Sequence, residues 1–560
     1  MPLSVHLGTD HTTDFERLVA ARDGLAEVLA RTDDATAADL LVGDAGIVLA
    51  LPWDDARPPY RFPALPLSEA GLLAACNVAL GDYETAHQHL ATQPDIAPEL
   101  LAEIVLAHHV AYGQPVDATM EAVLRVPSDD AAERGRQAHN RAVVLHYTHA
   151  DREDAEAAYA LAAAAIQSPE ARAFTAKHYA TFLLDGDAAP LAEQVVTKTL
   201  AGVTDNVVCD ALNETLSQAL LAQVAPPYDA DLLARLKPLL WAQVERHEAA
   251  DRPVALAMRL TDAALVAQVE GSFAEAVGYA RRAIAAVEYE DVPSVWAQAF
   301  MRKGSVLHAW AEAGHPQFYK PASEAYQQAL KVFTRDTAPA TFAEIHHELG
   351  ILYAEMPGPK GKRELVQALS VQSFRQALAF FAKETHPYVH ARICHNYGSA
   401  FLKYPTAHDG WNYERAAHFL REALALRPAD HHPTERALTL LNLLEASWHL
   451  PGTEGTLDAR RLAEMRGWAD EVHLLTDDAD LRATATEHRA HLDRLVAGAT
   501  GDGAVDEAVV EATPPASFPM KGHEAVPFVR EGDSPRSDQR ETTQDGGSSA
   551  HATTSEVRHA

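Results

Sequence analysis

The sequence predicts an all-α fold, a superhelical solenoid of antiparallel helix pairs followed by a disordered C-terminal tail. Three observations predict it. Prolines recur at a nearly constant spacing in the second half of the chain, and apolar residues follow each proline at helical spacing. The composition, with a hydrophobic fraction of 47% and abundant alanine, also favours packed helices over sheets. At 560 residues the chain is long for one core, so an elongated array or several domains are expected.

The repeat is clearest in its first helix. Its prolines are spaced 46, 48 and 46 residues apart, each is followed four residues later by alanine, and the first three are followed eleven residues later by glycine. Proline fits the first turn of a helix. A glycine inside a helix costs about 1 kcal/mol relative to alanine, so its return at one phase predicts the close approach of another helix. The prolines are Pro293, Pro339, Pro387 and Pro433, and the glycines are Gly304, Gly350 and Gly398, with Leu444 in the fourth unit.

A second helix completes each unit. Pro357, Pro405 and Pro451 end the first helix at one phase, and after a loop the segments 322–333 and 413–426 resume the apolar pattern of a helix. Each unit is therefore a helical hairpin with one apolar side. Such a segment is repeated either because a chemical site is duplicated or because copies of one unit bury their apolar faces against each other.

These units resemble the tetratricopeptide repeat family, whose unit of about 34 residues reads W-x2-L-G-x2-Y, then A-x3-F, then A and P. Gly350 and Gly398 match the family glycine, and Ala322, Tyr326 and Ala329 match its second helix. The loop within each unit is longer than the family's by about six to eight residues, as in long-loop bacterial members. The resemblance implies a non-enzymatic scaffold that binds a protein or peptide through its groove or loop edge.

The same reading gives a domain organisation. Residues 1–66 are expected to form an N-terminal cap that could include a short strand at GIVLALPW, and residues 67–253 to form degenerate helical repeats. Residues 254–498 form the tetratricopeptide-like repeats, clearest over 293–451. Residues 499–560 are polar and without period, which predicts disorder, and their apolar clusters SFPM and VPFV are either docking peptides or parts of an inert tail.

The charge limits the partners. The chain carries 79 acidic and 47 basic residues, a formal net charge of −32, so we expect no nucleic-acid partner. Such an acidic, lysine-poor composition suits either a salt-rich cytosol, as a halophilic adaptation, or an ordinary protein from a GC-rich genome. No apolar run suggests a signal peptide or a membrane span, so the expected location is the cytoplasm. The 3 cysteines are far apart in sequence, which argues against a disulfide framework or a thiolate metal site.

Motifs for chemistry are absent. The sequence has no GxxxxGK[ST], GxSxG or strand-bound GxGxxG, and none of its His-Glu pairs has the zincin spacing. His386 and His390, or His488 and His491, could share a helix face, but neither pair has a further ligand at suitable spacing. We therefore predict no catalytic residue, no metal and no cofactor. An enzyme with an unrecognised site in residues 1–250 stays as a minor alternative.

The resemblance implies where a partner would bind. His347 and His395 occupy one slot of two neighbouring units, in a position that tends to face the groove in this family. Alternatively, these histidines only make hydrogen bonds between neighbouring helices. The alternative function is a regulatory or sensor subunit that responds to a small ligand or controls a separate enzyme. The candidate partner-binding residues are Met301, Ser305, His308, Glu344, His347, Ile351, Arg392, His395 and Ser399.

Overall fold

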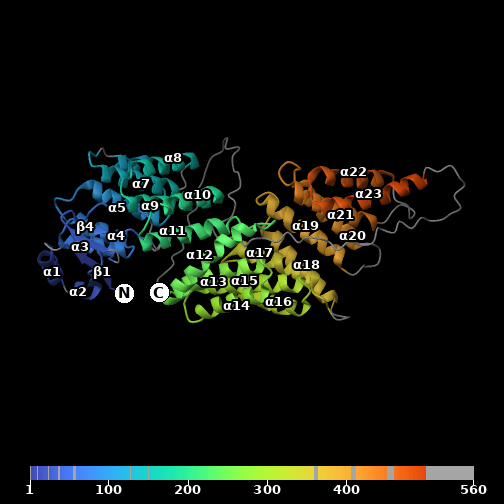
Figure 1. The fold of residues 1–560 in the computed structure, drawn as a ribbon, viewed down its shortest axis with the longest axis horizontal. Helices are drawn as coiled ribbons and strands as arrows, with labels where there is room; N and C mark the ends of the chain where they lie inside the picture. The colour runs from blue at the N-terminus through green and yellow to red at the C-terminus, as the bar shows by residue number, and fades with distance from the viewer. Residues whose placement is uncertain are drawn as a thin grey trace, which may run out of the picture. The chain divides into compact units, whose positions relative to one another are not determined.

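The chain divides into two compact units, Met1–Val295 (unit 1) and Trp296–Ala560 (unit 2), in a computed structural model. Within each unit, helices that follow one another in sequence pack against each other, so the predicted helical repeat fold is confirmed (Figure 1). No described helix is long and apolar enough to cross a lipid bilayer. The structure describes residues 2–8, 11–22, 24–35, 38–53, 59–125, 128–148, 151–358, 363–404, 411–450 and 459–499.

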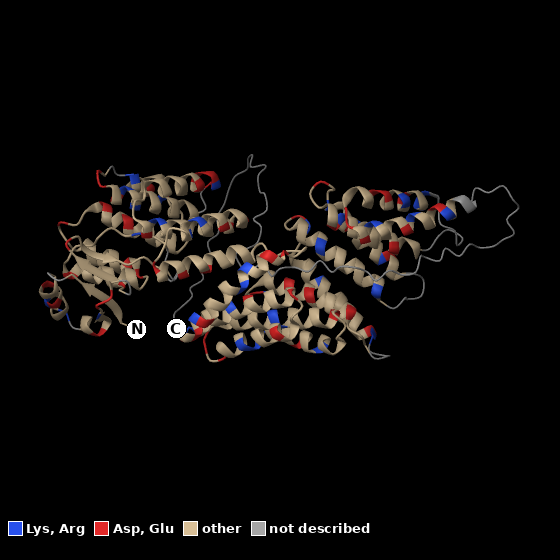
Figure 2. Ribbon diagram, in the orientation of Figure 1, with Lys and Arg blue, Asp and Glu red and all other residues tan. Residues whose placement is uncertain are grey.

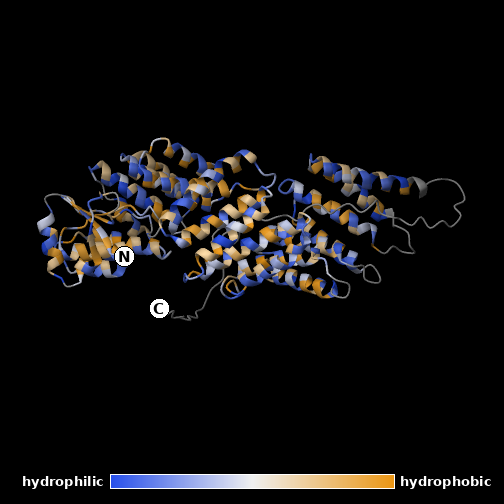
Figure 3. Cartoon of the chain, turned by 60° about the horizontal axis from the view of Figure 1, so that its bottom comes forward, coloured by the Kyte–Doolittle hydropathy of each residue, from blue (hydrophilic) through white to orange (hydrophobic). Residues whose placement is uncertain are grey.

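Unit 1 begins with a four-stranded sheet in the order β2-β1-β3-β4, where the sequence allowed only a short strand. β1 is parallel to β2 and β3, and β3 and β4 form an antiparallel hairpin. Gly46 turns this hairpin with φ of 105°, and a Cβ there would lie 2.2 Å from the Leu65 carbonyl oxygen. The strands are largely hydrophobic (Figure 3). Their bounds are β1 Leu3–Leu7, β2 Leu29–Arg31, β3 Leu40–Gly43 and β4 Gly46–Leu49.

The rest of unit 1 is helical. Aspartate or serine side chains accept hydrogen bonds from the first-turn N–H groups of several helices, such as Asp82 before α4 and Ser168 before α9. The sheet shares its core with α3, α4 and α5. The helices are α1 Thr12–Ala20, α2 Leu25–Val28, α3 Glu69–Ala79, α4 Tyr83–Ala91, α5 Pro98–Ala111, α6 Ala118–Glu121, α7 Ala131–Tyr147, α8 Arg152–Ala165, α9 Pro169–Asp185, α10 Ala189–Leu200, α11 Asn206–Leu221, α12 Ala230–Ala249, α13 Pro253–Val269 and α14 Phe273–Ala286, with a 3-10 turn at Ala122–Arg125.

Unit 2 contains the regular repeat. Each of the four predicted prolines is the first residue of a helix, as expected from a ring that fixes φ and lacks an N–H. These first helices are α15, α17, α19 and α21, and each is followed by its pairing helix. The bounds are α15 Pro293–Glu312, α16 Tyr319–Ala329, α17 Pro339–Glu355, α18 Arg363–Phe380, α19 Pro387–Lys403, α20 Trp411–Ala425, α21 Pro433–Trp448, α22 Ala459–Leu475 and α23 Ala479–Ala499, with a 3-10 turn at Pro316–Phe318.

The repeated glycines lie where the two helices of a pair touch, which confirms the prediction of a close approach. A Cβ on Gly304 would lie 2.9 Å from the Tyr326 ring, and one on Gly350 would lie 2.9 Å from the Phe374 ring. At Gly398 it would lie 2.7 Å from Leu420 Cγ. Real carbon atoms pack at about 3.5–4.0 Å, so a side chain at any of these three positions would displace the facing residue.

α19 is enclosed on all sides. Every residue from His390 to Phe401 is buried, although a helix on a protein surface normally exposes one face. Helices α17, α18, α20 and α21 all pack against it. The enclosed faces include polar side chains, so α19 contributes hydrogen-bonding groups to the interior of unit 2.

The predicted disordered tail from residue 500, with its SFPM and VPFV clusters, lies outside the described residues. The same is true of parts of the long loops, residues 359–362, 405–410 and 451–458.

Candidate functional site

Carboxylates on α17 connect the first helices of unit 2. Lys403 Nζ, on α19, donates a hydrogen bond of 2.6 Å to Glu355 Oε1, while His308 Nε2, on α15, lies 3.4 Å from Glu355 Oε2. Glu344 faces Arg392 in a similar way, with Oε1 3.5 Å from Nη2. Acidic and basic side chains are interspersed along these helices (Figure 2). Ion pairs therefore tie neighbouring repeats together.

Three carboxylates lie around His308. We call Glu312, Glu348 and Glu355 the acidic cluster; the ligand atoms of His308, Glu312 and Glu355 lie within 4.8 Å of one another. The pKa of Glu312 is raised to about 7, because burial raises it more than His308 lowers it and the charge of Glu355 adds to the rise. Burial also raises the pKa of Glu348. Burial alone would lower the pKa of His308, but the surrounding glutamates outweigh burial and raise it. The positive charge at the cluster comes from His308 and from Lys403, which pairs with Glu355.

Glu344 lies one helical turn before Glu348 on α17. Burial raises the pKa of its carboxyl to about 7, although Arg392 lowers it. The charge of Glu348, on the same helix, acts against Arg392. A single guanidinium at 3.5 Å therefore does not compensate the loss of water around this carboxylate.

Buried amides and imidazoles form a second set of contacts between the first helices. Asn396 Nδ2, on α19, donates to His347 Nε2, on α17, at 3.0 Å. His395 Nδ1 lies 3.1 Å from Thr439 Oγ1, on α21. Asn442 Nδ2 donates to Ser399 Oγ at 2.8 Å, which also joins α21 to α19. Each contact is inside the protein, where a satisfied hydrogen bond fixes how neighbouring helices align.

The nine residues predicted to line a groove are in or near these networks, but most are enclosed. The structure buries His347 and His395 fully and leaves only Ser305 and Glu344 half-buried. In this structure the histidines make hydrogen bonds between neighbouring helices, which is the alternative that the sequence left open. The other buried members are Met301, His308, Ile351, Arg392 and Ser399.

The three glutamates of the acidic cluster and the two asparagines were not singled out from the sequence, yet a signal was present. Arg302, Glu348, Asn396 and Asn442 each follow a repeat proline by nine residues. The same position of the repeat is therefore polar in all four units, although it faces neighbouring helices. Aligning the four units at the ninth residue after each proline, and not only at the position of His347 and His395, would have identified these polar residues.

Two groups among the described residues could hold a metal ion. One is His308 with Glu312 and Glu355, and the other is His390 with Cys394 and Glu422. His386 and His390, which could have shared a helix face, do not do so, because His386 precedes α19 and its Nδ1 contacts Thr385 Oγ1 at 2.9 Å. His488 accepts a hydrogen bond of 2.9 Å from Trp448 Nε1, so this histidine has a structural partner.

Unit 1 contains a cavity of about 740 Å³. The four aromatic side chains Trp53, Tyr60, Phe62 and Tyr83 line it, together with residues of β3 and β4. The first residues of α9 and α11 also line it, and the N-termini of helices carry partial positive charge. Its size is that of a pocket for a small molecule.

Two arginines line this cavity, and they differ in their hydrogen-bond partners. Arg136 makes hydrogen bonds of 2.6 Å to both Glu103 and Glu133, so its charge is compensated. Arg61 Nη1 is buried and has no hydrogen-bond partner among the described residues. Burial lowers the pKa of Arg61, and repulsion by Arg136 adds to this effect. An anion in the cavity would supply the partner that Arg61 Nη1 lacks.

Comparisons with known proteins give general similarity only. No family model and no curated protein matches the chain. Among solved structures, the human IFIT1 dimer with m7Gppp-AAAA has 14% identity and a TM-score of 0.40, covering 77% of this chain and 90% of that one. Yeast Tom70 has 12% identity and a TM-score of 0.36, covering 77% and 89%. A circular tandem repeat protein has 13% identity and a TM-score of 0.18, covering 76% and 95%. All three TM-scores are below 0.5.

Proposed function

We propose that the chain is a non-enzymatic binding scaffold of the tetratricopeptide type, and that unit 2 binds a basic segment of a protein partner at the acidic cluster. The observation that carries this proposal is the grouping of three carboxylates around His308. Glu312 is an exposed residue and its carboxylate lies within 4.8 Å of the other ligand atoms, so the cluster is open to solvent on the Glu312 side. An arginine or lysine side chain of a partner would reach it there.

A bound cation would change the protonation of the cluster. Glu312, with a pKa of about 7, is partly protonated at neutral pH because burial and neighbouring carboxylates disfavour its charge. A guanidinium beside it stabilises the ionised form, so binding lowers this pKa and releases a fraction of a proton near pH 7. Non-specific attraction by the net charge of the chain would release no such proton.

The test uses a fluorescein-labelled nonapeptide library with one fixed arginine and the same library with citrulline at that position. Citrulline keeps the shape of arginine and lacks its charge. We expect the arginine library to bind the full chain more tightly, and Glu312→Gln to weaken this binding about tenfold, the effect of one charge-assisted hydrogen bond. Calorimetry in two buffers of different ionisation enthalpy measures the proton release.

The matched control is Glu324→Gln. Glu324 is an exposed residue of α16 that pairs with Lys320, so the substitution changes the net charge equally at a distance from the cluster. Equal binding of the two libraries, or an equal loss in both variants, would refute the site.

The cavity of unit 1 favours a second candidate function, that of a sensor for a small ligand. Its aromatic walls and Arg61 suit an aromatic anion. The probe is 8-anilinonaphthalene-1-sulfonate, whose fluorescence rises in an apolar site. We expect saturable binding that Arg61→Met weakens and that Arg134→Met, an exposed control whose guanidinium bonds backbone carbonyls, leaves unchanged. Equal binding to both variants would refute this candidate.

A further inference from the structure

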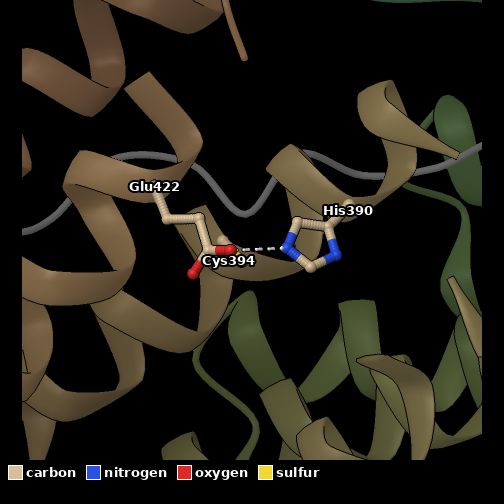
Figure 4. A group of neighbouring side chains, drawn as sticks. All are labelled: His390, Cys394 and Glu422. Carbon is tan, nitrogen blue, oxygen red and sulfur yellow. Dashed lines mark hydrogen bonds and ion pairs between the residues drawn. The ribbon is translucent and has the colours of Figure 1, made fainter. Parts of the chain in front are cut away.

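Three potential metal ligands converge between α19 and α20, away from the acidic cluster. His390 and Cys394 lie one helical turn apart on α19, and Glu422 faces them from α20 (Figure 4). One nitrogen of His390, the sulfur of Cys394 and one oxygen of Glu422 all lie within 4.8 Å of one another. A nitrogen, a sulfur and an oxygen donor therefore surround one point.

The ring of His390 is oriented so that Nε2, and not Nδ1, faces the other two potential ligands. Its Nδ1 lies 2.9 Å from the Phe381 carbonyl oxygen and donates a hydrogen bond to it. Without a metal, Nε2 pairs with Glu422 Oε1 at 3.0 Å, so the two groups that would bind the ion already face each other. Histidines that bind metals usually donate their second N–H to a carbonyl or carboxylate, which fixes the ring and the tautomer. The hydrogen bond to Phe381 is an observation of this kind, independent of the presence of three ligands.

The three ligands lie between buried apolar side chains on the Cys394 side and solvent on the Glu422 side. Cys394 is fully buried and packs with Ala391 and Ala423. The side chain of Glu422 is 28% exposed, so the site meets solvent on the α20 side. Three protein ligands and one open position occupied by water are typical of zinc sites that are not fully closed. The apolar wall would keep other water away from the sulfur.

We propose that His390 Nε2, Cys394 Sγ and Glu422 bind one Zn²⁺ ion, with water as the fourth ligand. Mixed N, S and O donors suit zinc, whereas calcium and magnesium prefer oxygen ligands only. Ligand atoms of a tetrahedral zinc ion are about 3.3–3.8 Å apart, so the two helices need only a small adjustment. On binding, the S–H bond of Cys394 and the Nε2–H bond of His390 break, the S–Zn, N–Zn and O–Zn bonds form, and two protons leave to solvent. The ion would join the two helices of one repeat.

The experiment uses the full chain, reduced and freed of metal with a chelator. Calorimetry with Zn²⁺ measures affinity and stoichiometry. Co²⁺, which takes the same geometry, reports a thiolate ligand through a sulfur-to-metal charge-transfer band in the near ultraviolet. We expect one ion per chain and a Co²⁺ charge-transfer band, both lost in Cys394→Ser. Glu422→Gln should weaken Zn²⁺ binding at least tenfold while far-UV circular dichroism stays unchanged.

Two control variants separate this site from other metal sites in the chain. Cys209→Ser removes another cysteine, and Glu312→Gln disables the group around His308. Both should keep the charge-transfer band. A wild-type chain without the band, a band that survives Cys394→Ser, or zinc binding that only Glu312→Gln abolishes would overturn the proposal. Glu422→Gln keeps the proposal testable even if Cys394→Ser does not fold, because Glu422 is half-buried at the edge of the site.

Discussion

Gly350→Ala should destabilise unit 2, although alanine is the better helix former. The added Cβ would lie 2.9 Å from Phe374 Cγ and 3.0 Å from both Cδ atoms. Phe374 cannot move away freely, because it is fully buried and its ring stacks on Tyr397 at a centroid distance of 4.7 Å. The helices must therefore separate by roughly 0.6 Å to restore ordinary carbon contacts.

The magnitude follows from two opposing effects. Overpacking in a core costs about 1–3 kcal/mol, and replacing glycine by alanine within a helix gains about 1 kcal/mol. The net loss for Gly350→Ala is then about 0–2 kcal/mol. Gly467, on α22 of the same unit, has nothing within 4 Å of its Cβ position, so Gly467→Ala should gain up to about 1 kcal/mol. The two variants should differ by about 1–3 kcal/mol.

The assay is urea unfolding followed by circular dichroism, together with hydrogen exchange of peptides from α17 and α18. Hydrogen exchange reports the free energy of local opening, so it isolates this helix pair from unit 1. We expect faster exchange in Gly350→Ala and slower or unchanged exchange in Gly467→Ala. Equal stabilisation by both substitutions would refute the idea that the repeated glycine is selected by close helix packing.

Three further outcomes follow from the buried polar groups and the surface charge. Replacing His347 and His395 together by alanine should lower the free energy of unfolding by about 1–3 kcal/mol for each buried partner left unsatisfied, a loss that urea titration measures. Glu344 has a folded pKa of about 7, above its unfolded value, so stability should fall as pH rises from about 4.5 to 7. Glu344→Gln should flatten this fall, and equal pH profiles for variant and wild type would contradict the assignment. If the net charge of −32 is an adaptation to salt, the melting temperature should rise steadily to molar potassium chloride, and a flat profile would speak against it.

The sequence alone was sufficient to predict where the first helices of unit 2 begin and where they contact their partner helices. Pro339 and Pro387 begin helices because their ring constrains φ, which is a property of one residue. Gly350 marks a close contact because a helix interior otherwise disfavours glycine. Such signals depend only on nearby positions, so they are readable without knowing which helices meet.

Contacts between residues far apart in the sequence could not be predicted in the same way. Cys394 and Glu422 lie on different helices, and nothing in either residue alone indicates the other. The burial of His347 depends on the side chains of the next repeat, especially Asn396. The sheet of unit 1 was missed in most of its extent because its strands are only 3–5 residues long, too short for a clear alternating pattern.

The complete enclosure of α19 bears on how this protein can evolve. In most solenoids each repeat contacts only its neighbours, so units can be duplicated, deleted or trimmed while the remainder stays folded. Here a chain shortened before α21 would expose polar and apolar faces of α19 together, since α21 covers Ser399 and His395. The repeats around α19 are therefore expected to be inherited as one block, with changes in repeat number confined to positions outside it.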